Sequence, residues 1–249
     1  RTQYTLDDTH YFSVFDIESG DPDPVTRTVP ITVTAEPSRK HRYAASIGYG
    51  TDTKARGKFT WDNRRVNEDG HKFKLELLGS SIVSDLTGRY VVPVMDIALE
   101  KLEFTGTLRD EELGDTQSKR AEVSAGLTQV QGRWQRVLRV ALAEEETIEA
   151  DNTSSTNFYI VPSIGYSTLP SYIVGGRRRP YSFSAELRGS PETLGSDASF
   201  LQLRLKGERI FDMTELWHLH LRSELGISRI AATSDLPASQ RFFAGGEGS

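Results

Sequence analysis

The chain has 249 residues, no cysteine and a formal net charge of -5, with 26% charged and 9% aromatic residues, and is long enough for one all-β domain or two smaller domains. The negative charge argues against a general nucleic-acid-binding protein, and the lack of cysteine excludes disulfides, thiolate metal sites and cysteine nucleophiles. No apolar run approaches the roughly 18 residues of a spanning helix, which excludes helical membrane proteins and leaves barrels open.

The first 38 residues contain two predicted strands, at 11–17 and 28–35. Between them lies the sequence Gly-Asp-Pro-Asp-Pro at 20–24, which is typical of a turn and through which no strand could run. Glu-Pro-Ser at 36–38 ends the second strand and forms a short linker. Two strands alone are too small to be stable. We therefore expect this segment to pack on further structure.

The next stretch, residues 42–61, alternates with a period of two. Its apolar and aromatic positions are Tyr43, Ala45, Ile47 and Tyr49, followed after a turn at 51–53 by Ala55, Gly57, Phe59 and Trp61. The intervening positions are Ala44, Ser46, Gly48 and Gly50, and then Arg56, Lys58 and Thr60. This pattern predicts two paired strands with one apolar face and one small or basic face.

The same alternation continues to residue 229 with little helical periodicity. It predicts eleven strands, at 43–51, 54–63, 71–80, 82–94, 101–112, 118–130, 133–146, 156–168, 180–189, 197–211 and 214–229. Minimal turns at 131–132 and 212–213 contrast with longer polar loops at 149–155 and 190–196. Short turns at one end and longer loops at the other are typical of an up-and-down barrel of the outer-membrane type.

Two folds fit this alternation. In a soluble β-barrel or sandwich, the apolar side chains form the core and the charged side chains face water. In a transmembrane barrel the apolar side chains face lipid, and Lys, Arg, Glu and His line a wet lumen. Aromatic residues near strand ends would then form interfacial girdles: Tyr43, Trp61, Trp134, Tyr181 and Trp217.

Two motifs far apart in the chain resemble the outer-membrane assembly barrel superfamily. Residues 46–52, Phe-Thr-Trp at 59–61 and Asn-Glu-Asp-Gly-His at 67–71 are similar to the first three strands of those barrels. The last segment resembles the start of the family's sixth extracellular loop: Arg241, Phe242, Phe243, Ala244, Gly245, Gly246, Glu247, Gly248 and Ser249. Within the superfamily the sequence is most similar to the TamA branch, the translocation and assembly module subunit, a relative of BamA.

The resemblance implies a domain organisation. Residues 1–38 would be the C-terminal part of a periplasmic POTRA domain, although the helix expected before residue 11 is missing. Residues 39–249 would be the N-terminal part of an outer-membrane β-barrel, ending in the sixth loop. The first barrel strand would meet the last one at a lateral gate, and its gate residues would be Tyr43, Ala45, Ser46, Ile47, Gly48, Tyr49 and Gly50. Bacterial barrels have even strand numbers and this family about sixteen, so we expect the closing strands beyond residue 249.

The function implied is that of a non-enzymatic assembly factor in the bacterial outer membrane, with its N-terminal segment in the periplasm. Its partners would be outer-membrane lipid, unfolded β-barrel or autotransporter substrates and an inner-membrane-anchored TamB-like protein, and it would bind no nucleic acid. The alternatives are a two-partner secretion pore of the same superfamily and a soluble β-sandwich binding module.

The sequence offers no enzyme chemistry: it lacks a nucleophile elbow and a phosphate-binding loop, and we predict no catalytic residue, cofactor or metal. His218 and His220 share one strand face without a third ligand, so we expect a solvated pair in the lumen. The side chains of residues 144–146, all Glu, are expected at a polar strand end. For the strand at 197–211 we predict that Arg is costly at Leu203, which faces lipid, and tolerated at Gln202, which faces the lumen.

Overall fold

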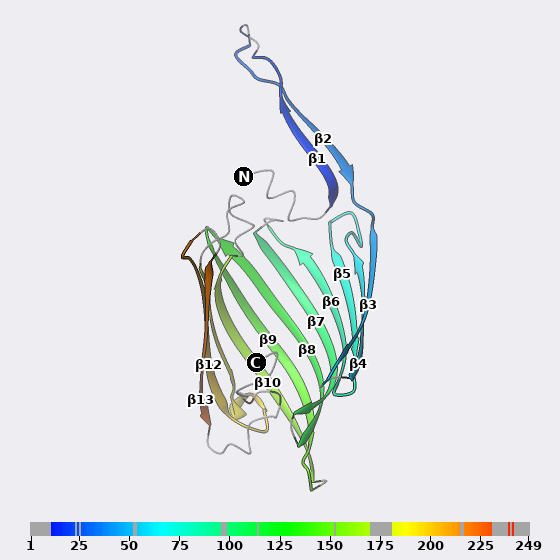
Figure 1. Ribbon diagram of the computed structural model, residues 1–249, viewed down its shortest axis with the longest axis vertical. Helices are drawn as coiled ribbons and strands as arrows, with labels where there is room; N and C mark the ends of the chain where they lie inside the picture. The colour runs from blue at the N-terminus through cyan, green and yellow to red at the C-terminus, as the bar shows by residue number, and fades with distance from the viewer. Residues whose placement is uncertain are drawn as a thin grey trace.

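The computed structural model describes residues 11–22, 24, 26–51, 54–95, 99–113, 115–151, 153–169, 181–214, 217–230, 239 and 241. These residues form thirteen strands in two antiparallel sheets, with one short 3-10 helix, η2 (Glu192–Leu194). Strands β1 and β2 make a two-stranded sheet, and β3 to β13 make one sheet of eleven strands (Figure 1). The predicted all-β class is confirmed. A sandwich of two packed sheets, the soluble alternative, is not the observed fold.

The small sheet is a hairpin of β1 (Phe12–Ser19) and β2 (Ile31–Pro37) that projects from one end of the large sheet (Figure 1). Both predicted strands are confirmed with shifted ends. Ile17 pairs with Val33 and Ser19 with Ile31, so three apolar side chains lie on one face. Val33 is 53% exposed and Ile31 67%. The hairpin therefore presents an apolar face that no described element covers.

The large sheet follows the chain order without a crossover, from β3 at one edge to β13 at the other. All eleven predicted strands are present, with ends within four residues of the predicted ones. They are β3 (His41–Gly50), β4 (Lys54–Asn63), β5 (Lys72–Gly79), β6 (Val83–Pro93), β7 (Glu100–Leu113), β8 (Thr116–Gln131), β9 (Trp134–Ile148), β10 (Ser154–Thr168), β11 (Tyr181–Ser190), β12 (Phe200–Asp212) and β13 (His218–Ile230).

The sheet curls into an incomplete barrel whose two edges, β3 and β13, lie on opposite sides of an open front (Figure 1). We call the end that carries β1 and β2 the hairpin end and the opposite end the distal end. The β9–β10 connection and η2 lie at the distal end, and β3 runs from the hairpin end to the distal end (Figure 1). Across the described residues, no helix is long and apolar enough to cross a membrane.

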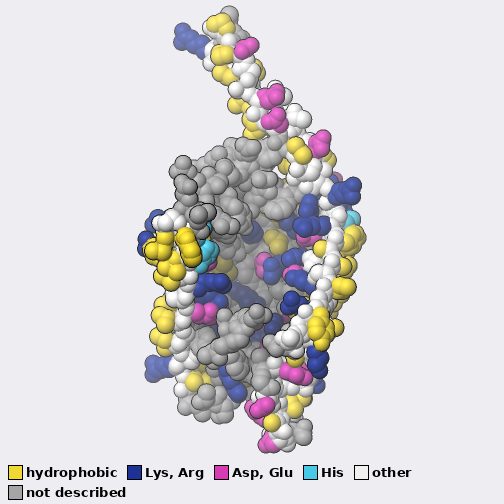
Figure 2. Space-filling view, in the orientation of Figure 1, with side chains coloured by type: hydrophobic (Ala, Val, Ile, Leu, Met, Phe, Trp, Pro, Cys, Tyr) yellow, Lys and Arg dark blue, Asp and Glu magenta, His cyan; other side chains and the backbone are white. Residues whose placement is uncertain are grey.

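The pairing register assigns each side chain to the inside or the outside of the barrel. The outer side chains are apolar and exposed, for example Phe104 at 45%, Val123 at 59% and Leu225 at 64%. The inner side chains are mostly charged or hydroxylated, and Figure 2 shows charged groups in the hollow between hydrophobic outer flanks. Apolar side chains on the outside suit lipid, whereas a soluble barrel would bury them inside.

One small apolar cluster lies on the inner face near the distal end. It consists of five buried residues with Ile230 packed against them: Ala141, Tyr159, Val161, Ala198 and Phe200. Tyr159 and Phe200 meet edge to face at 6.4 Å between ring centroids. Because Ala198 belongs to the β11–β12 connection, the cluster holds this connection against β9 and β10.

Among the described residues, Tyr11 joins the hairpin to the barrel. The Tyr11 hydroxyl donates a hydrogen bond to the Gly70 carbonyl at 2.5 Å, and the Lys72 ammonium lies 5.0 Å above the Tyr11 ring. Gly70 has φ +78°, and a Cβ there would lie 2.3 Å from the Tyr11 hydroxyl oxygen. Burial raises the pKa of Tyr11 above its usual value of 10.0, so the hydroxyl remains a donor at neutral pH. This joint requires glycine at position 70 for both conformation and space.

Candidate functional site

The predicted gate residues all lie on β3, an edge strand of the large sheet. Within the described residues β3 pairs only with β4, from His41↔Asn63 to Gly50↔Lys54. Every residue of the strand except Gly50 is exposed, and the exposed fraction reaches 95% at Ile47. The second row of β3 backbone groups therefore has no strand partner among the described residues, and such open sheet edges are pairing sites.

Within the part of the chain that the structure describes, aromatic contacts anchor the outer side of β3 near the hairpin end. Tyr43 and Trp61 stack with ring centroids 6.5 Å apart and an angle of 8° between their planes. The Trp61 indole Nε1 donates to His41 Nδ1 at 3.3 Å, and Phe73 meets Trp61 edge to face at 5.6 Å. These contacts hold the beginning of β3 on β4, and the aromatic side chains lie on the predicted outer face.

Towards the distal end, the outer side of the edge is hollow. A groove of about 670 Å³ is lined on this face by Ile47, Tyr49, Ala55, Gly57 and Gly79. No heavy atom beyond the chain neighbours lies within 4 Å of a Cβ built on Gly57 or Gly79. The wall here is only backbone thick, so large side chains of a neighbouring strand can lie beside β3 without a clash.

On the inner side, Gly48 leaves room for the Arg56 side chain beside the backbone of β3. A Cβ at Gly48 would meet Arg56 Nε at 3.1 Å and Arg56 Cγ at 3.5 Å. The absence of a side chain therefore lets the Arg56 guanidinium lie close over the β3 backbone. Arg56 of β4 therefore places a basic group on the lumen side of β3, at the level where the outer side of β3 is open.

Ion pairs line the inner face from β4 to β13. Their heavy-atom distances are 2.9 Å for Lys58–Glu76, 3.2 Å for Lys74–Glu76, 3.2 Å for Arg89–Glu103, 3.7 Å for Arg109–Asp85, 2.5 Å for Arg109–Glu111 and 3.2 Å for Lys206–Glu224. Arg204 also pairs with Glu224. Among the described residues, Lys119–Glu146 at 3.7 Å is the outward-facing pair. The lumen wall is thus charged but locally neutralised.

The most enclosed part of this wall centres on Glu145 of β9, whose side chain is 1% exposed. The Ser118 hydroxyl donates to its carboxylate at 2.9 Å, and Arg120 Nη1 donates at 3.4 Å. Arg120 also pairs with Glu122, which in turn pairs with Arg139. A buried carboxylate needs such partners, because an unpaired charge in this position would be strongly destabilising.

The same carboxylate binds a residue that follows β13. The Ser239 backbone N–H donates to Glu145 at 3.0 Å, the Ser239 hydroxyl donates to it at 2.5 Å, and Arg120 Nη1 lies 2.5 Å from the Ser239 hydroxyl oxygen. Ser239, two residues before the predicted sixth-loop motif, therefore contacts the lumen wall. Of that motif, only Arg241 belongs to the described residues, and the other eight positions lie outside them.

Sequence reasoning missed Glu145 by treating residues 144–146 as one polar strand end. Leu138, Val140 and Leu142 point outward, so the period of two sends Glu144 and Glu146 outward and Glu145 inward. The alternation of side chains along β9 could therefore have predicted that Glu145 points inward. The partner Ser239 lies 94 residues away and carried no signal in the sequence.

The expectation for Gln202 was wrong. Its side chain is 1% exposed, accepts a hydrogen bond from Arg188 Nε at 2.9 Å and donates one to the Ser228 hydroxyl at 2.9 Å. An Arg at this position would break both hydrogen bonds, so it is not neutral. His218 and His220 lie on the inner face of β13, and the described residues contain no group of three or more potential metal ligands.

The fold and the polarity of its faces define the class of the protein: a transmembrane β-barrel with a charged lumen, seen here with eleven strands. The model of one family, the Omp85 superfamily domain, matches residues 43–249. The chain belongs to this superfamily, and the resemblance noted from the sequence motifs is confirmed at this level.

Two solved structures share the fold. One is BamA from Haemophilus ducreyi lacking POTRA domains 1–3, with a TM-score of 0.76 and 13% identity over 98% of this chain and 51% of that chain. The other is CdiB from Acinetobacter baumannii, with a TM-score of 0.57 and 11% identity over 97% of this chain and 48% of that one. The chain thus spans about half the length of these proteins.

Proposed function

We propose that the protein is a non-enzymatic outer-membrane factor that inserts or secretes other proteins, with β3 as one side of a lateral gate. The observation that carries this proposal is the edge of β3, which has a row of backbone groups without a described partner and an open groove beside it. Each unpaired backbone group in lipid costs about 1–3 kcal/mol. A weakly paired edge therefore favours pairing with an incoming strand by β-augmentation.

The proposed orientation places the hairpin end in the periplasm and the distal end outside the cell. Residues 1–38 would belong to a POTRA domain, and residues 39–249 to the barrel up to its sixth extracellular loop. The exposed apolar face of Ile17, Ile31 and Val33 supports this division, because such a face requires a covering element. Within the superfamily we assign the protein to the TamA branch, with autotransporter or barrel substrates and a TamB-like inner-membrane partner.

A reversible lock on the gate tests the proposal. One cysteine replaces Ser46 of β3 and a second is placed on the final strand of the intact protein, at several registers, since a disulfide needs Cα atoms within about 7 Å. Residues 1–249 contain no cysteine, and any cysteine elsewhere in the intact protein is replaced by serine. We expect the oxidised protein to keep its folded, heat-modifiable form on a gel and to lose substrate assembly, and reduction to restore it. A verified crosslink with full activity would exclude lateral opening.

The two-partner secretion pore is the second candidate, and the shared fold with CdiB favours it. A secretion pore passes its substrate through the lumen, so the gate lock would leave export intact. The contact of Ser239 with Glu145 and Arg120 would then lie in the path of the substrate. Measuring export of a secreted substrate and insertion of a barrel substrate with the same locked protein separates the two functions.

A further inference from the structure

Strand pairing in the barrel wall is incomplete between β10 and β11, far from the β3 edge. These strands pair only from Ser163↔Arg188 to Ser167↔Ser184, whereas β10 continues through residues 154–162 toward the distal end. Pairing stops at Pro162, which has no N–H to offer to β11. The two strands therefore separate at the distal end while β10 remains paired with β9.

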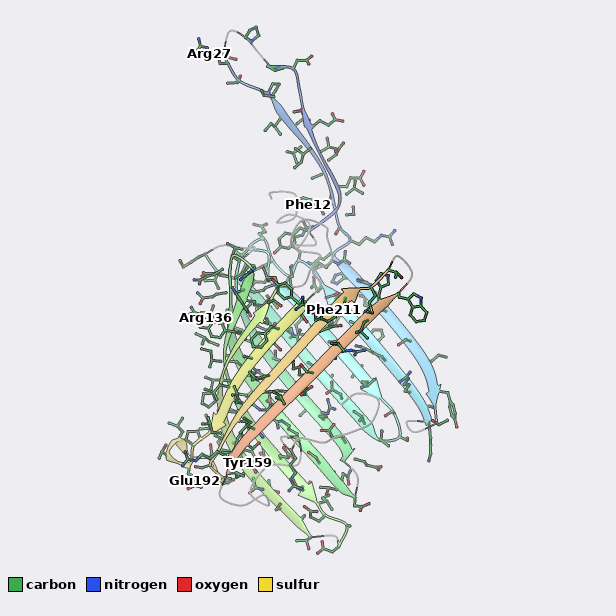
Figure 3. All side chains as sticks on the ribbon, turned by 60° about the vertical axis from the view of Figure 1, so that its left-hand side comes forward. Phe12, Arg27, Arg136, Tyr159, Glu192 and Phe211 are labelled. Atoms are coloured by element: carbon green, nitrogen blue, oxygen red, sulfur yellow. The ribbon has the colours of Figure 1, made fainter. Side chains whose placement is uncertain are left out.

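The β11–β12 connection fills the gap between these strands from the inside. The Ile160 N–H donates to the Ser196 hydroxyl at 3.0 Å, and the Phe158 N–H donates to the Asp197 carboxylate at 2.5 Å. The Asp197 N–H donates back to the Phe158 carbonyl at 2.9 Å. Figure 3 labels Tyr159 of β10 and Glu192 of η2, both toward the distal end. The open backbone of β10 is thus satisfied, and the opening is closed toward the lumen.

On the outer face the same separation leaves a groove of about 850 Å³. Its outward-facing lining is Pro162, Ile164, Leu187, Gly189 and Leu201. The inward-facing neighbours Ser190 and Phe200 are 0% and 5% exposed, so the groove opens away from the lumen. A Cβ at Gly189 would lie 3.0 Å from the Phe200 carbonyl oxygen, so the floor is in tight contact with β12. This volume lies within the usual range of about 300–1,000 Å³ for ligand pockets.

One cation stands at the distal rim of this apolar groove. Arg229 lines the groove, is the second-last residue of β13 and lies opposite Leu201 on the outer face. Within the part of the chain that the structure describes, no carboxylate forms an ion pair with Arg229. The outward positions at the distal end of β9 are instead acidic, Glu144 and Glu146. An apolar slot with a cation at its rim complements a lipid whose headgroup carries an anionic phosphate.

We infer that this groove binds one anionic membrane lipid, with an acyl chain along Ile164, Leu187 and Leu201 and the phosphate at Arg229. The inference rests on the proposed membrane orientation, in which the distal end lies at the membrane surface. The lipid covers the thin, incompletely paired part of the wall. Its negative charge distinguishes it from neutral lipids, because Arg229 places a cation at the rim of an outward-facing lining that is otherwise apolar.

The test uses the intact protein in nanodiscs of phosphatidylcholine that contain a small fraction of phosphatidylglycerol with a diazirine on one acyl chain. After illumination, labelled residues are mapped by mass spectrometry. We expect labelling of Ile164, Leu187 and Leu201 to exceed that of Leu86, an outward residue of β6 in a different hollow, of about 630 Å³, whose outward lining includes Glu144 and Glu146. Arg229→Gln should reduce the excess about fivefold, the factor that one arginine near an anionic surface provides.

Three comparisons make the outcome decisive. Arg209→Gln, an outward arginine on β12 at the hairpin end that lies 4.5 Å from the Phe211 ring, should leave the labelling unchanged. Leu187→Trp should lower it by filling the groove while Arg229 remains. A diazirine phosphatidylcholine should label the groove no more than Leu86. Labelling of the groove at the level of Leu86, or an excess that Arg229→Gln does not change, would overturn the inference. Absence of any labelling at Leu86 would instead reject the membrane placement itself.

Discussion

The edge strand β3 and the wall strands β8 and β9 share one alternation of side chains but are held in different ways. β8 and β9 have 16 and 15 residues, pair on both sides and enclose the Glu145 network. β3 has 10 residues, pairs with β4 alone among the described strands and takes part in none of their ion pairs. Its anchors are backbone hydrogen bonds and aromatic stacking at one end. The comparison shows that period-two patterning predicts a strand and its faces but does not predict which contacts hold the strand in place.

The largest effect is expected from removing the centre of the wall. Glu145→Ala should lower the free energy of unfolding by about 3–5 kcal/mol, because it leaves Arg120, Ser118 and Ser239 without their shared acceptor. Glu144→Ala, the adjacent outward carboxylate, should change it by less than about 0.5 kcal/mol. Urea unfolding of the intact protein in lipid vesicles measures both. Equal losses for the two variants would show that the Glu145 contacts are not stabilising.

The outer side of the wall gives the next largest effect. Leu203 lies between Leu187 and Ile227 on the lipid face of β12. Leu203→Arg should cost about 2–4 kcal/mol near the middle of the bilayer. Ser182→Arg, on the inner face of β11 opposite Glu208, should be nearly neutral and replaces Gln202 as the control. Both variants are refolded into lipid vesicles and unfolded with urea. If they have the same urea midpoint of unfolding, the assignment of the two faces is wrong.

Two serines compare wall and edge directly. Ser118 on β8 donates to the Glu145 carboxylate at 2.9 Å, so Ser118→Ala should cost about 1.5–3 kcal/mol. Ser46 occupies an exposed inward position on β3, and Ser46→Ala should lie within about 0.5 kcal/mol of the natural protein. Urea unfolding of both variants in lipid vesicles measures the two free energies. A loss at Ser46 as large as that at Ser118 would mean that the edge strand has stabilising contacts comparable to those of the wall.

The smallest effect concerns the joint between hairpin and barrel. Gly70→Ala forces a Cβ onto the Tyr11 hydroxyl at φ +78°, and such strain costs about 1–3 kcal/mol. We expect the hairpin to detach locally while the barrel stays folded. Hydrogen exchange at the Ser38 amide, which donates to the Tyr11 carbonyl, should accelerate. Gly57→Ala, where the Cβ meets open space, serves as the control. Unchanged exchange of the Ser38 amide in Gly70→Ala would show that the contact between Tyr11 and Gly70 does not hold the hairpin on the barrel.

The strands and their faces were predictable from the sequence because a period of two leaves few alternatives. Tyr43, Ile47 and Tyr49 carried the apolar face of β3, and the structure places all three outward. The pattern did not distinguish a soluble barrel from a membrane barrel, since both alternate. The family motifs favoured the membrane barrel, and the single curled sheet with a charged interior now supports it.

The contacts between inner side chains were not predictable, because each depends on the exact register of neighbouring strands or on where a connection folds back. Gln202 reads as an ordinary solvated position between two leucines, yet Arg188 and Ser228 enclose it from the two neighbouring strands. Pro162 did mark a local break in pairing. Ser196 and Asp197 bind the unpaired β10 backbone at this break, and they belong to a connection more than thirty residues later in the chain.

The order of the strands also has a consequence for assembly kinetics. Every pairing in the large sheet joins consecutive strands, so each requires closure of a short loop only. A strand that pairs with the free edge of β3 at or beyond β13 must instead close roughly 170 residues. The entropy of loop closure grows with the logarithm of length, which makes this one pairing about 3 kcal/mol less favourable than a hairpin. Topology alone therefore makes this pairing the last to form during folding and the first to separate, whichever side chains line it.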